Sequence, residues 1–469
     1  MKVAVIGAGY VGLSTGVALA YVGHEVTCVD IDAEKIRKLK DGKVPFFEPH
    51  LEELLGEVRS RMKFTDFLPE AAARADMVFL AVGTPAGSDG SPDMTDWYAA
   101  ASETLACLKG KSAPTVLVNK STVPAGTADR LQRLADKAGL AGKVTVASNP
   151  EFLRQGCALE DTLYPDRIVV GGDEAAAEAL ERLYTPIIRQ SFAPPSGVAR
   201  PEGLTRVPFV VTDRISAEIS KYAANAFLAM KISFINEIAN VCDRVGANVE
   251  SVAGIIGMDP RIGPAFLRAG IGFGGSCFPK DTRALQYMAS SSGYEFRLLS
   301  AVIEVNNAQK DILLSKLREE LRDLRGRKIA VLGLAFKPMT DDMREAPSVP
   351  IIRALLDEGA RVWAHDPAAL EKARTVLPGE VRLCASLHEA LQDAEAALLV
   401  TDWPEYAQLE GAYIRRTMKR PLWIDGRNAL NPAARREIEY RGIGLGGVRS
   451  GLAAEDEEVA YAKYPKILA

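Results

Sequence analysis

The hydrophobic pattern at the start of the chain predicts a buried parallel strand, because residues 2–6 form a short run rich in β-branched side chains. A helix is expected over residues 13–22 and a second strand over residues 25–30. Two further apolar runs, at residues 115–118 and 144–147, predict strands that each end in a polar segment. Strands of this kind, separated by helices, indicate an α/β fold with a parallel sheet.

A glycine motif follows the first predicted strand. Residues 7–12 read Gly-Ala-Gly-Tyr-Val-Gly, the G-x-G-x-x-G arrangement. Gly7 permits a tight turn, Gly9 lets the backbone approach a pyrophosphate, and Gly12 lets the next helix pack closely. Asp30 ends the second strand 18 residues after Gly12, where a carboxylate binds the adenosine ribose hydroxyls and repels a 2′-phosphate. The motif therefore predicts a dinucleotide site that favours NAD over NADP.

The same strand pattern recurs in the second half of the chain. Residues 328–335 parallel 2–9, residues 361–366 parallel 25–30, and residues 394–400 parallel 75–81. Three strand motifs in the same order imply two Rossmann-like, doubly wound parallel-sheet domains. In the second copy Leu334-Ala335 replaces Ala8-Gly9, so its loop suits a pyrophosphate less well. We infer that the first copy binds the dinucleotide and the second binds another ligand.

The charge-free segment after Lys2 has a competing interpretation. Residues 3–23 carry no charge, and Ala18-Leu19-Ala20 resembles a signal-peptidase site, as in a secretory signal. The internal copy favours strand, turn and helix instead, since the same pattern occurs far from the terminus. Elsewhere no uncharged apolar run approaches the roughly 20 residues that span a bilayer.

The middle of the chain differs in its residue composition. Residues 212–245 contain no Gly or Pro, which predicts one long helix ending at Gly246, and its apolar positions are numerous enough to be buried on more than one side. Residues 191–208, rich in Pro, Gly, Ser and Arg, predict an exposed loop. The expected division is a dinucleotide-binding domain over 1–211, a central helical and dimerisation domain over 212–312, a second Rossmann-like domain over 313–441, and a loosely ordered tail over 442–469.

Composition narrows the functional classes. The 469 residues include 57 Lys and Arg against 61 Asp and Glu, so the charge balance predicts neither nucleic acid nor a membrane as partner. The six cysteines are scattered and never spaced C-x-x-C, and there are only four histidines, so no metal is expected. A reducing, cytoplasmic setting fits this cysteine usage best.

One cysteine stands in an unusual context. Four glycines surround Cys277 within residues 270–281, and Lys280 and Asp281 follow it. Such a loop exposes the sulfur and several backbone N–H groups, and a nucleophilic thiolate needs its pKa drawn below about 8.5 by such N–H groups or by a cation. A nucleophile is therefore the favoured interpretation of Cys277, and a buried inert thiol that of the other five.

Further polar residues lie at places where α/β sheets bind ligands. Residues 119–122 and 149–151 follow the strands at 115–118 and 144–147. Lys221 and Asn225, four residues apart, share one face of the long helix, although a solvated lysine and a surface amide are equally open interpretations.

In the second α/β half, cationic residues follow the predicted strands. Lys337 and Arg344 come after the strand at residues 328–332, and Arg427 comes after residues 421–424. Such cations suit a phosphate or a nucleotide, with surface salt bridges as the ordinary alternative.

The ordered set of motifs resembles the UDP-glucose/GDP-mannose dehydrogenase family, and within it the UDP-glucose 6-dehydrogenases. The resemblance runs over about residues 1–440. It rests on GAGYVG (7–12), VGTP (82–85), KSTVP (120–124), NPEFL (149–153), SKYAANAFLAMKISFINE (220–237), GFGGSCFPKD (272–281), LAFKP (334–338) and DGRN (425–428).

The resemblance implies the four-electron oxidation of a sugar CH2OH group to a carboxylate with two NAD+ in succession. Cys277 would attack the intermediate aldehyde, giving a thiohemiacetal and then a thioester that water hydrolyses. Lys221 and Asn225 would stabilise oxyanions, Asp281 and Thr122 would position a water, and Glu151 would serve acid–base steps. The cofactor contacts implied are Gly7, Gly9, Tyr10, Val11, Gly12, Asp30, Lys35, Thr84, Thr122, Lys280 and Arg344. The substrate contacts implied are Glu151, Phe152, Leu153, Lys221, Asn225, Arg261, Phe273, Gly274, Phe278, Phe336, Lys337 and Arg427.

The resemblance also implies a homodimer or a higher homo-oligomer, because Arg261 resembles a substrate ligand donated by a neighbouring subunit. Gln155 departs from the family pattern, which often has an acid there, and the loop at 191–208 looks longer than usual. Gln155 can still hydrogen-bond a water at the reaction site, but it cannot take a proton.

Three alternatives stay open at this point. A GDP-mannose or N-acetylated UDP-sugar dehydrogenase would share the mechanism, although Phe278 and the surrounding motif favour UDP-glucose. A two-electron dehydrogenase of the hydroxyacid type would leave Cys277 without a role. In a nucleotide-sensing binding protein we would expect some of the catalytic residues to be replaced, whereas Cys277, Lys221, Asn225, Glu151 and Asp281 are all present.

Overall fold

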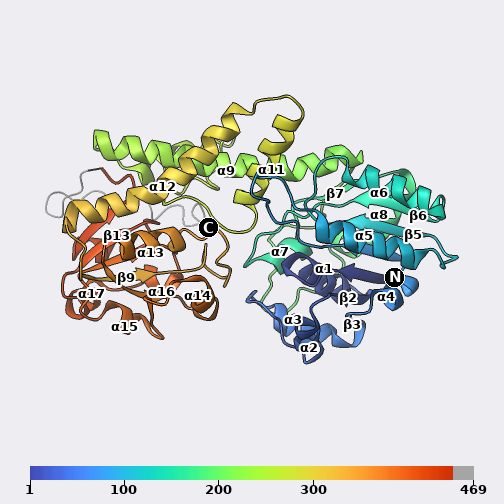
Figure 1. Ribbon diagram of the computed structural model, residues 1–469, viewed down its shortest axis with the longest axis horizontal. Helices are drawn as coiled ribbons and strands as arrows, with labels where there is room; N and C mark the ends of the chain where they lie inside the picture. The colour runs from blue at the N-terminus through green and yellow to red at the C-terminus, as the bar shows by residue number, and fades with distance from the viewer. Residues whose placement is uncertain (447–469) are drawn as a thin grey trace. The chain divides into compact units, whose positions relative to one another are not determined.

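The computed structural model describes residues 1–446 and divides the chain into two compact units (Figure 1). The first comprises residues 1–224 and 283–292, and the second comprises residues 225–282 and those from 293 onward. Helices α9 (Arg214–Val245) and α11 (Phe278–Ser291) each contribute residues to both units. Within the described residues, no helix is long and apolar enough to cross a membrane.

The first unit is built on an eight-stranded sheet in the order β3-β2-β1-β4-β5-β6-β7-β8. All neighbouring strands are parallel except β6 and β7, which pair antiparallel at one position. Its strands are β1 (Lys2–Ile6), β2 (Glu25–Val29), β3 (Met62–Thr65), β4 (Met77–Leu80), β5 (Thr115–Asn119), β6 (Val144–Ser148), β7 (Ile168–Gly171) and β8 (Phe209–Thr212). Its α-helices besides α9 and α11 are α1 (Tyr10–Tyr21), α2 (Ala33–Lys40), α3 (Leu51–Val58), α4 (Leu68–Arg74), α5 (Thr95–Leu108), α6 (Thr127–Ala135), α7 (Ala158–Leu163) and α8 (Glu174–Ile188).

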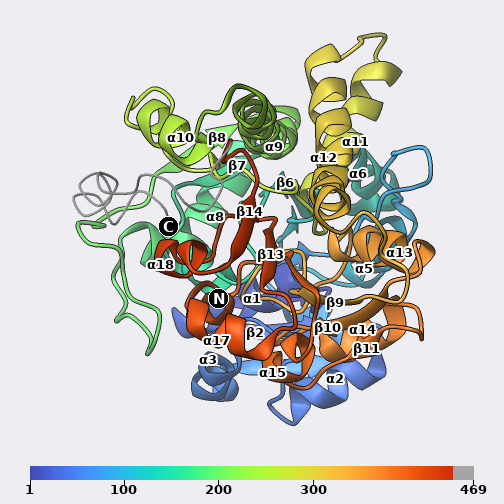
Figure 2. The same cartoon turned by 90° about the vertical axis from the view of Figure 1, so that its left-hand side faces the viewer.

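The second unit repeats this topology in a six-stranded, fully parallel sheet of order β11-β10-β9-β12-β13-β14. Figure 2 shows β13 and β14 side by side in this sheet. Its strands are β9 (Lys328–Leu332), β10 (Arg361–His365), β11 (Arg382–Leu383), β12 (Ala396–Leu399), β13 (Leu422–Asp425) and β14 (Glu439–Gly442). Its other helices are α10 (Val249–Gly257), α12 (Arg297–Leu321), α13 (Ser348–Asp357), α14 (Leu370–Val376), α15 (Leu387–Leu391), α16 (Pro404–Ala407), α17 (Gly411–Thr417) and α18 (Pro432–Arg436).

Each sheet is buried on both faces, as a doubly wound fold requires. Val3 and Val5 of β1 point into one apolar core, whereas Ala4 and Ile6 point into another on the opposite face. The first strand of the second sheet behaves in the same way, since alternate residues of β9 enter two separate cores. Burial on both faces explains why these strands are continuous apolar runs, and the predicted fold class is confirmed.

Two predicted segments differ from the structure. The first helix begins at Tyr10 instead of residue 13, because the N–H of Leu13 already donates to the carbonyl of Gly9 at 2.9 Å. The expected tail from Gly442 starts with ordered residues: Gly442 ends β14 and Ile443 is fully buried. The rest of that tail, from residue 447, lies outside the described residues.

The long helix and the long loop match the prediction. Helix α9 covers 32 residues and ends one residue before Gly246. Residues 191–208 contain neither helix nor strand and are mostly exposed. Three buried residues, Pro195, Val198 and Val207, anchor the loop, and the Tyr164 hydroxyl donates to the Val198 carbonyl at 3.2 Å.

Candidate active site

The glycine motif forms the turn between β1 and α1. Gly7 has a φ of +97°, and a Cβ there would lie 2.5 Å from the Ala81 carbonyl oxygen. A Cβ on Gly12 would lie 1.8 Å from the Gly7 carbonyl oxygen. Gly9 differs, because no atom lies within 4 Å of its Cβ position. The turn thus leaves open space beside Gly9 at the start of α1, as a pyrophosphate bound to a helix N-terminus requires.

Asp30 lies at the end of β2 and is directed toward this turn. Its Oδ2 accepts hydrogen bonds from the N–H of Ala8 and from Nζ of Lys35, both at 2.8 Å. The N–H of Asp32 donates to Oδ1 at 3.1 Å. Only 9% of Asp30 is exposed. These contacts hold the carboxylate beside the phosphate turn, where the sequence predicts the ribose site.

The second unit uses the equivalent acid differently. Asp366 is fully buried and accepts from the N–H groups of Leu334 and Ala335 and from Nε1 of Trp403. Its other oxygen accepts from the N–H groups of the loop before α14. Because these donors already occupy both oxygens of Asp366, the carboxylate is not available to a ribose hydroxyl. This agrees with the inference that the first copy binds the dinucleotide.

Two predicted residues form a buried ion pair in the first unit. Nζ of Lys221, on α9, lies 3.0 Å from Oε1 of Glu151, in the segment after β6. The N–H of Leu153 donates to Oε2 of Glu151 at 2.5 Å. Burial acts to raise the pKa of Glu151, but Lys221, the Leu153 N–H and Lys120 outweigh it, so this pKa lies below its ordinary value. Glu151 is therefore held as a carboxylate.

Lys120, a residue without a predicted role, extends this cluster. Its Nζ donates to Oδ1 of Asn149 at 3.0 Å, and the Tyr184 hydroxyl donates to the same oxygen at 2.8 Å. Burial lowers the pKa of Lys120 to about 8, with Glu151 opposing the shift and Lys221 adding to it. Lys221 pairs directly with Glu151, whereas Lys120 is held by Asn149 and feels the charges of both.

Thr122 lies in the segment between β5 and α6 of the same unit. The hydroxyl of Thr84, another predicted cofactor contact, donates to the Thr122 carbonyl at 2.7 Å. Phe152, beside Glu151, has its ring 5.7 Å from Nζ of Lys221 and 3.9 Å from the guanidinium of Arg167. Tyr10 packs against Phe46, with ring centroids 4.0 Å apart. Of the predicted cofactor contacts, only Lys280 and Arg344 belong to the second unit.

Cys277 lies at the start of α11 in the second unit. The N–H of Asp281 donates to the Cys277 carbonyl at 2.8 Å, so the cysteine occupies the N-cap of this helix. Its side chain is half-buried, and Sγ lies 3.8 Å from the Ser276 hydroxyl. The partial positive charge of a helix N-terminus stabilises negative charge on such a sulfur.

The first turn of α11 also carries a buried carboxylate. Asp281 is 1% exposed. Its Oδ2 accepts from Nδ2 of Asn225 at 2.6 Å, and its Oδ1 accepts from Nζ of Lys280 at 2.6 Å. The structure therefore brings Asn225, Lys280 and Asp281 together one turn from Cys277.

The glycine-rich loop before Cys277 is held by a residue without a predicted role, Asn306 of α12. Oδ1 of Asn306 accepts from the Phe273 N–H at 2.7 Å, and its Nδ2 donates to the Phe273 carbonyl at 3.1 Å. A Cβ on Gly272 would lie 2.6 Å from that Oδ1. The loop glycines are thus required for close packing as well as for access to the sulfur.

The remaining predicted substrate contacts of the second unit lie around this loop. A Cβ on Gly275 would lie 2.6 Å from the Phe336 ring, and one on Gly274 would lie 2.3 Å from the Glu345 carbonyl. Arg427 donates to the carbonyls of Gly272 and Val400, at 2.9 and 2.8 Å. The rings of Phe273 and Phe278 meet edge to face, with centroids 5.6 Å apart.

Three cations of this unit are less enclosed. Nζ of Lys337 lies 5.8 Å from the centroid of the Phe336 ring. Arg344 is 60% exposed and paired with Asp342, and Arg261 is 88% exposed and paired with Asp259. The structure does not bring Arg261 to the other predicted residues of its unit.

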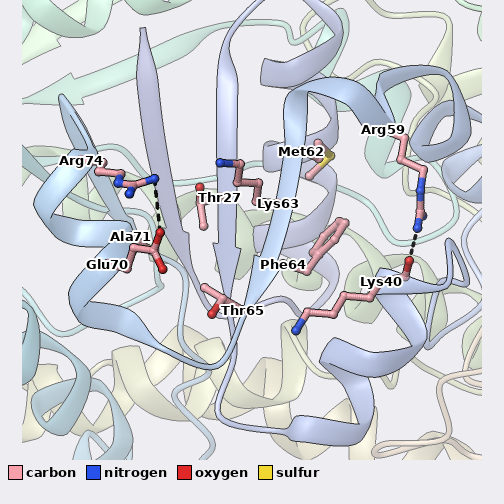
Figure 3. A pocket seen from close by; sticks show the side chains of 10 residues that line it. All are labelled: Thr27, Lys40, Arg59, Met62, Lys63, Phe64, Thr65, Glu70, Ala71 and Arg74. Atoms are coloured by element: carbon pink, nitrogen blue, oxygen red, sulfur yellow. Dashed lines mark hydrogen bonds and ion pairs between the residues drawn. The ribbon is translucent and has the colours of Figure 1, made fainter.

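A pocket of about 440 Å³ opens at the outer edge of the first sheet (Figure 3). It is lined by Thr27, Lys40, Arg59, Met62, Lys63, Phe64, Thr65, Glu70, Ala71 and Arg74. Arg74 pairs with Glu70 at 3.2 Å, and Arg59 donates to the Lys40 carbonyl. Because no predicted site residue lines this pocket, we assign it no part in the reaction.

The two related sheets, with an open phosphate turn on the first, are those of a dinucleotide-binding protein of the α/β class. Three domains of the UDP-glucose/GDP-mannose dehydrogenase family match the sequence: the NAD binding domain at residues 1–188, the central domain at 215–308 and the UDP binding domain at 330–432. The chain belongs to this family, and its cofactor is NAD.

Individual relatives match over nearly the whole chain. The chain is 46% identical to a UDP-glucose 6-dehydrogenase of Rhizobium meliloti (strain 1021) over 450 residues, 95% of this chain and 99% of the relative. It is 44% identical to UDP-glucose 6-dehydrogenase TuaD of Bacillus subtilis (strain 168), over 96% of this chain and 94% of that protein. A solved UDP-glucose dehydrogenase from Pyrobaculum islandicum is 39% identical, with a TM-score of 0.85 over 95% of this chain and 97% of that one.

Proposed function

We propose that this protein oxidises the CH2OH group of UDP-glucose to a carboxylate, forming UDP-glucuronate with two NAD+ consumed per sugar. Relatives named UDP-glucose 6-dehydrogenase, 44–46% identical over at least 95% of the chain, support this substrate. The observation that carries the four-electron reaction is the position of Cys277, which caps α11 one turn before Asp281 and its partner Asn225. A two-electron alcohol dehydrogenase has no use for such a nucleophile.

Cys277 makes the second oxidation possible. The first oxidation removes a hydride and a proton from the alcohol and leaves an aldehyde, which has no hydroxyl to oxidise. The Cys277 thiolate adds to the aldehyde carbon, and protonation of the resulting oxyanion gives a thiohemiacetal. Loss of a second hydride and of the hydroxyl proton gives a thioester. Water then attacks the thioester carbon, which releases the carboxylate and regenerates the thiol.

Lys221 and Glu151 are proposed to act on the oxygen of the reacting carbon. The ammonium of Lys221 stabilises the developing oxyanion, while Glu151 holds that ammonium and takes up a proton during thioester hydrolysis. Thr122 assists by positioning a water. These roles are supported by the burial of the Lys221–Glu151 pair, which strengthens its electrostatic effect.

Asn225, Asp281 and the residues around the glycine loop are proposed for the remaining roles. The Asn225 amide stabilises the oxyanion, and Asp281 orients that amide through its 2.6 Å hydrogen bond and helps to position the attacking water. Phe336, Lys337 and Arg427, near the glycine loop, contribute to binding the uridine nucleotide together with Phe273, Gly274 and Phe278. The UDP binding domain of the family, matched at residues 330–432, supports a UDP-sugar at this unit.

The residues present fit NAD, because the open space beside Gly9 and the carboxylate of Asp30 meet the needs of a pyrophosphate and a ribose diol. Bound NAD+ accepts the hydride of each oxidation. Gly7, Gly9 and Gly12 shape the turn with Tyr10 and Val11, Asp30 and Lys35 bind the ribose, and Thr84, Lys280 and Arg344 add further contacts.

We also propose a homodimer or larger homo-oligomer in which Arg261 reaches the substrate of a neighbouring subunit. Phe227 and Phe234 of α9 are 58% and 52% exposed, which gives the helix apolar surface to bury against a second copy. The enzyme is expected to act in the cytoplasm, where reduced thiols such as Cys277 are maintained. The proposed domain limits are 1–211, 212–312 and 313–441, and each matched family domain lies within one of them.

The substrate is tested by presenting UDP-glucose, GDP-mannose and UDP-N-acetylmannosamine separately and measuring the NADH formed. We expect the highest kcat/KM with UDP-glucose. A higher kcat/KM with GDP-mannose or with the N-acetylated sugar would contradict the proposed substrate and leave the chemistry of Cys277 intact.

A further inference from the structure

Glu218 is a buried carboxylate that has no part in the reaction proposed above. It lies on α9, three residues before Lys221, and is 4% exposed. Its Oε2 accepts from the N–H of Gly126 at 2.6 Å. Its Oε1 accepts from the N–H of Ala128 at 2.9 Å and from the Ser148 hydroxyl at 3.1 Å. Glu218 thus connects α9 to residues 126–128 and to Ser148, two segments distant from it in the sequence. We call these three hydrogen bonds the Glu218 tie.

Helix α6 needs this tie because it has no cap of its own. Its N-cap is Gly126, which lies in the left-handed region with a φ of +82° and carries no side chain that can accept a hydrogen bond. Glu218 reaches across from α9 and accepts from the N-cap N–H and from the Ala128 N–H of the first turn, while the Thr127 N–H donates to the Pro124 carbonyl at 3.2 Å. The start of α6 is thus fixed by a residue about 90 positions later in the sequence.

The tied segments each carry a proposed catalytic residue. Gly126 and Ala128 follow directly on the segment that contains Thr122. Ser148 is the last residue of β6 and leads into the segment that contains Glu151. Glu218 itself lies less than one helical turn from Lys221. One carboxylate therefore joins the supports of Thr122, Glu151 and Lys221.

We propose that Glu218 is a positioning residue, which holds the segments of Thr122 and Glu151 at fixed distances from Lys221. This inference rests on the proposed function, since it assigns those three residues to the reaction. Displacements of about 1 Å cost an enzyme on the order of 100-fold in rate, so a loosened tie is expected to lower kcat. Binding of the nucleotide, assigned to the second unit, is expected to persist.

Few charged side chains lie near Glu218. Asp129 of α6 faces it and is itself paired with Arg214 of α9 at 3.2 Å, while β6 contributes the uncharged Ser148. Burial, with a smaller effect of Asp129, raises the pKa of Glu218 to about 7 against the opposing effect of its three donors. Protonation removes the negative charge and converts one carboxylate oxygen into an O–H donor, so the tie weakens as the pH falls below about 7.

The test compares Glu218→Gln with the wild type. An amide presents an N–H₂ group toward backbone N–H donors, so it cannot replace the carboxylate. We expect kcat to fall at least about tenfold, which corresponds to about 1.4 kcal/mol, with KM for UDP-glucose within about twofold of the wild type. Amide hydrogen exchange over residues 121–128 should become faster, with exchange in the second unit unchanged.

Two further variants keep the test decisive. Asp76→Asn removes a carboxylate of the same unit that accepts from the Lys2 N–H at 2.8 Å, before β4 and away from both tied segments, so it should leave kcat unchanged. Ser148→Ala deletes one donor with little risk to folding and should lower kcat about threefold. Should Glu218→Gln retain full kcat, or lose no more than Asp76→Asn, the tie would have no positioning role. If the wild type does not oxidise UDP-glucose, the proposed function fails, and the exchange rates still report on the tie.

Discussion

Nζ of Lys221 lies 3.0 Å from Oε1 of Glu151, and only 3% and 6% of these side chains are exposed. A buried pair of this kind is costly to break from one side, because the remaining charge keeps its desolvation penalty without its partner. The same burial strengthens the field that each charge exerts on a nearby reaction. We therefore expect this pair to affect both the stability of the protein and the proposed reaction.

Single substitutions of this pair should destabilise the protein more than the double substitution. Lys221→Met and Glu151→Gln are each expected to lower the free energy of unfolding, Lys221→Met by about 3 kcal/mol. The double variant should recover part of this loss, since it leaves no unpaired charge. Denaturant unfolding of all four proteins gives the coupling energy. Additive losses would mean that the two side chains do not interact.

Lys120 should make stability depend on alkaline pH. Burial lowers its pKa to about 8 from an ordinary 10.5, so between these values the unfolded chain holds a proton that the folded chain has released. The free energy of unfolding is therefore expected to rise as the pH increases from about 8 to 10.5. Lys120→Met should lack this rise, and Lys143→Met, at an exposed lysine of the same unit, should retain it. Identical pH profiles for Lys120→Met and the wild type would be evidence against the shift.

Substitutions of two glycines in the phosphate turn should have separate effects, one on NAD+ binding and the other on stability. Gly9→Ala places a methyl group in open space and should leave Tm unchanged, yet weaken NAD+ binding by at least about 1.4 kcal/mol, a factor of ten in Kd. Gly12→Ala forces a Cβ to within 1.8 Å of the Gly7 carbonyl oxygen and should lower Tm by at least about 3 °C. Calorimetric binding and thermal melts measure both effects. Full NAD+ affinity in Gly9→Ala would place the pyrophosphate elsewhere.

Asp30 should determine the preference between the two nicotinamide cofactors. We propose that its carboxylate pairs with the ribose hydroxyls of NAD+ and repels a 2′-phosphate. Asp30→Asn is expected to raise KM for NAD+ about tenfold and to lower KM for NADP+. Asp32→Asn, at the neighbouring acid that caps α2, is the matched control. A wild-type preference for NADP+ would contradict the assignment directly.

Local patterns in the sequence identify the strands, the phosphate turn and Cys277, because each depends on a short apolar run or a cluster of glycines. Hydrogen-bond partners that are distant in the sequence cannot be predicted from such local patterns. Lys120 lies 29 positions from Asn149, Asn306 lies 33 from Phe273, and Glu218 lies 90 from Ala128. No local periodicity marks these residues, since their roles exist only once distant elements have packed. Lys120 and Asn149 lie within the motifs at 120–124 and 149–153, and these motifs are the signal in the sequence that points to them.

The central claim is that Cys277 carries the second of two oxidations. The decisive measurement is the number of NADH molecules formed per UDP-glucose consumed, in the wild type, in Cys277→Ser and in Cys107→Ser, which removes a half-buried thiol elsewhere. We expect two NADH per sugar for the wild type and for Cys107→Ser, and loss of steady-state turnover in Cys277→Ser. One NADH per sugar in the wild type, or full turnover by Cys277→Ser, would contradict it.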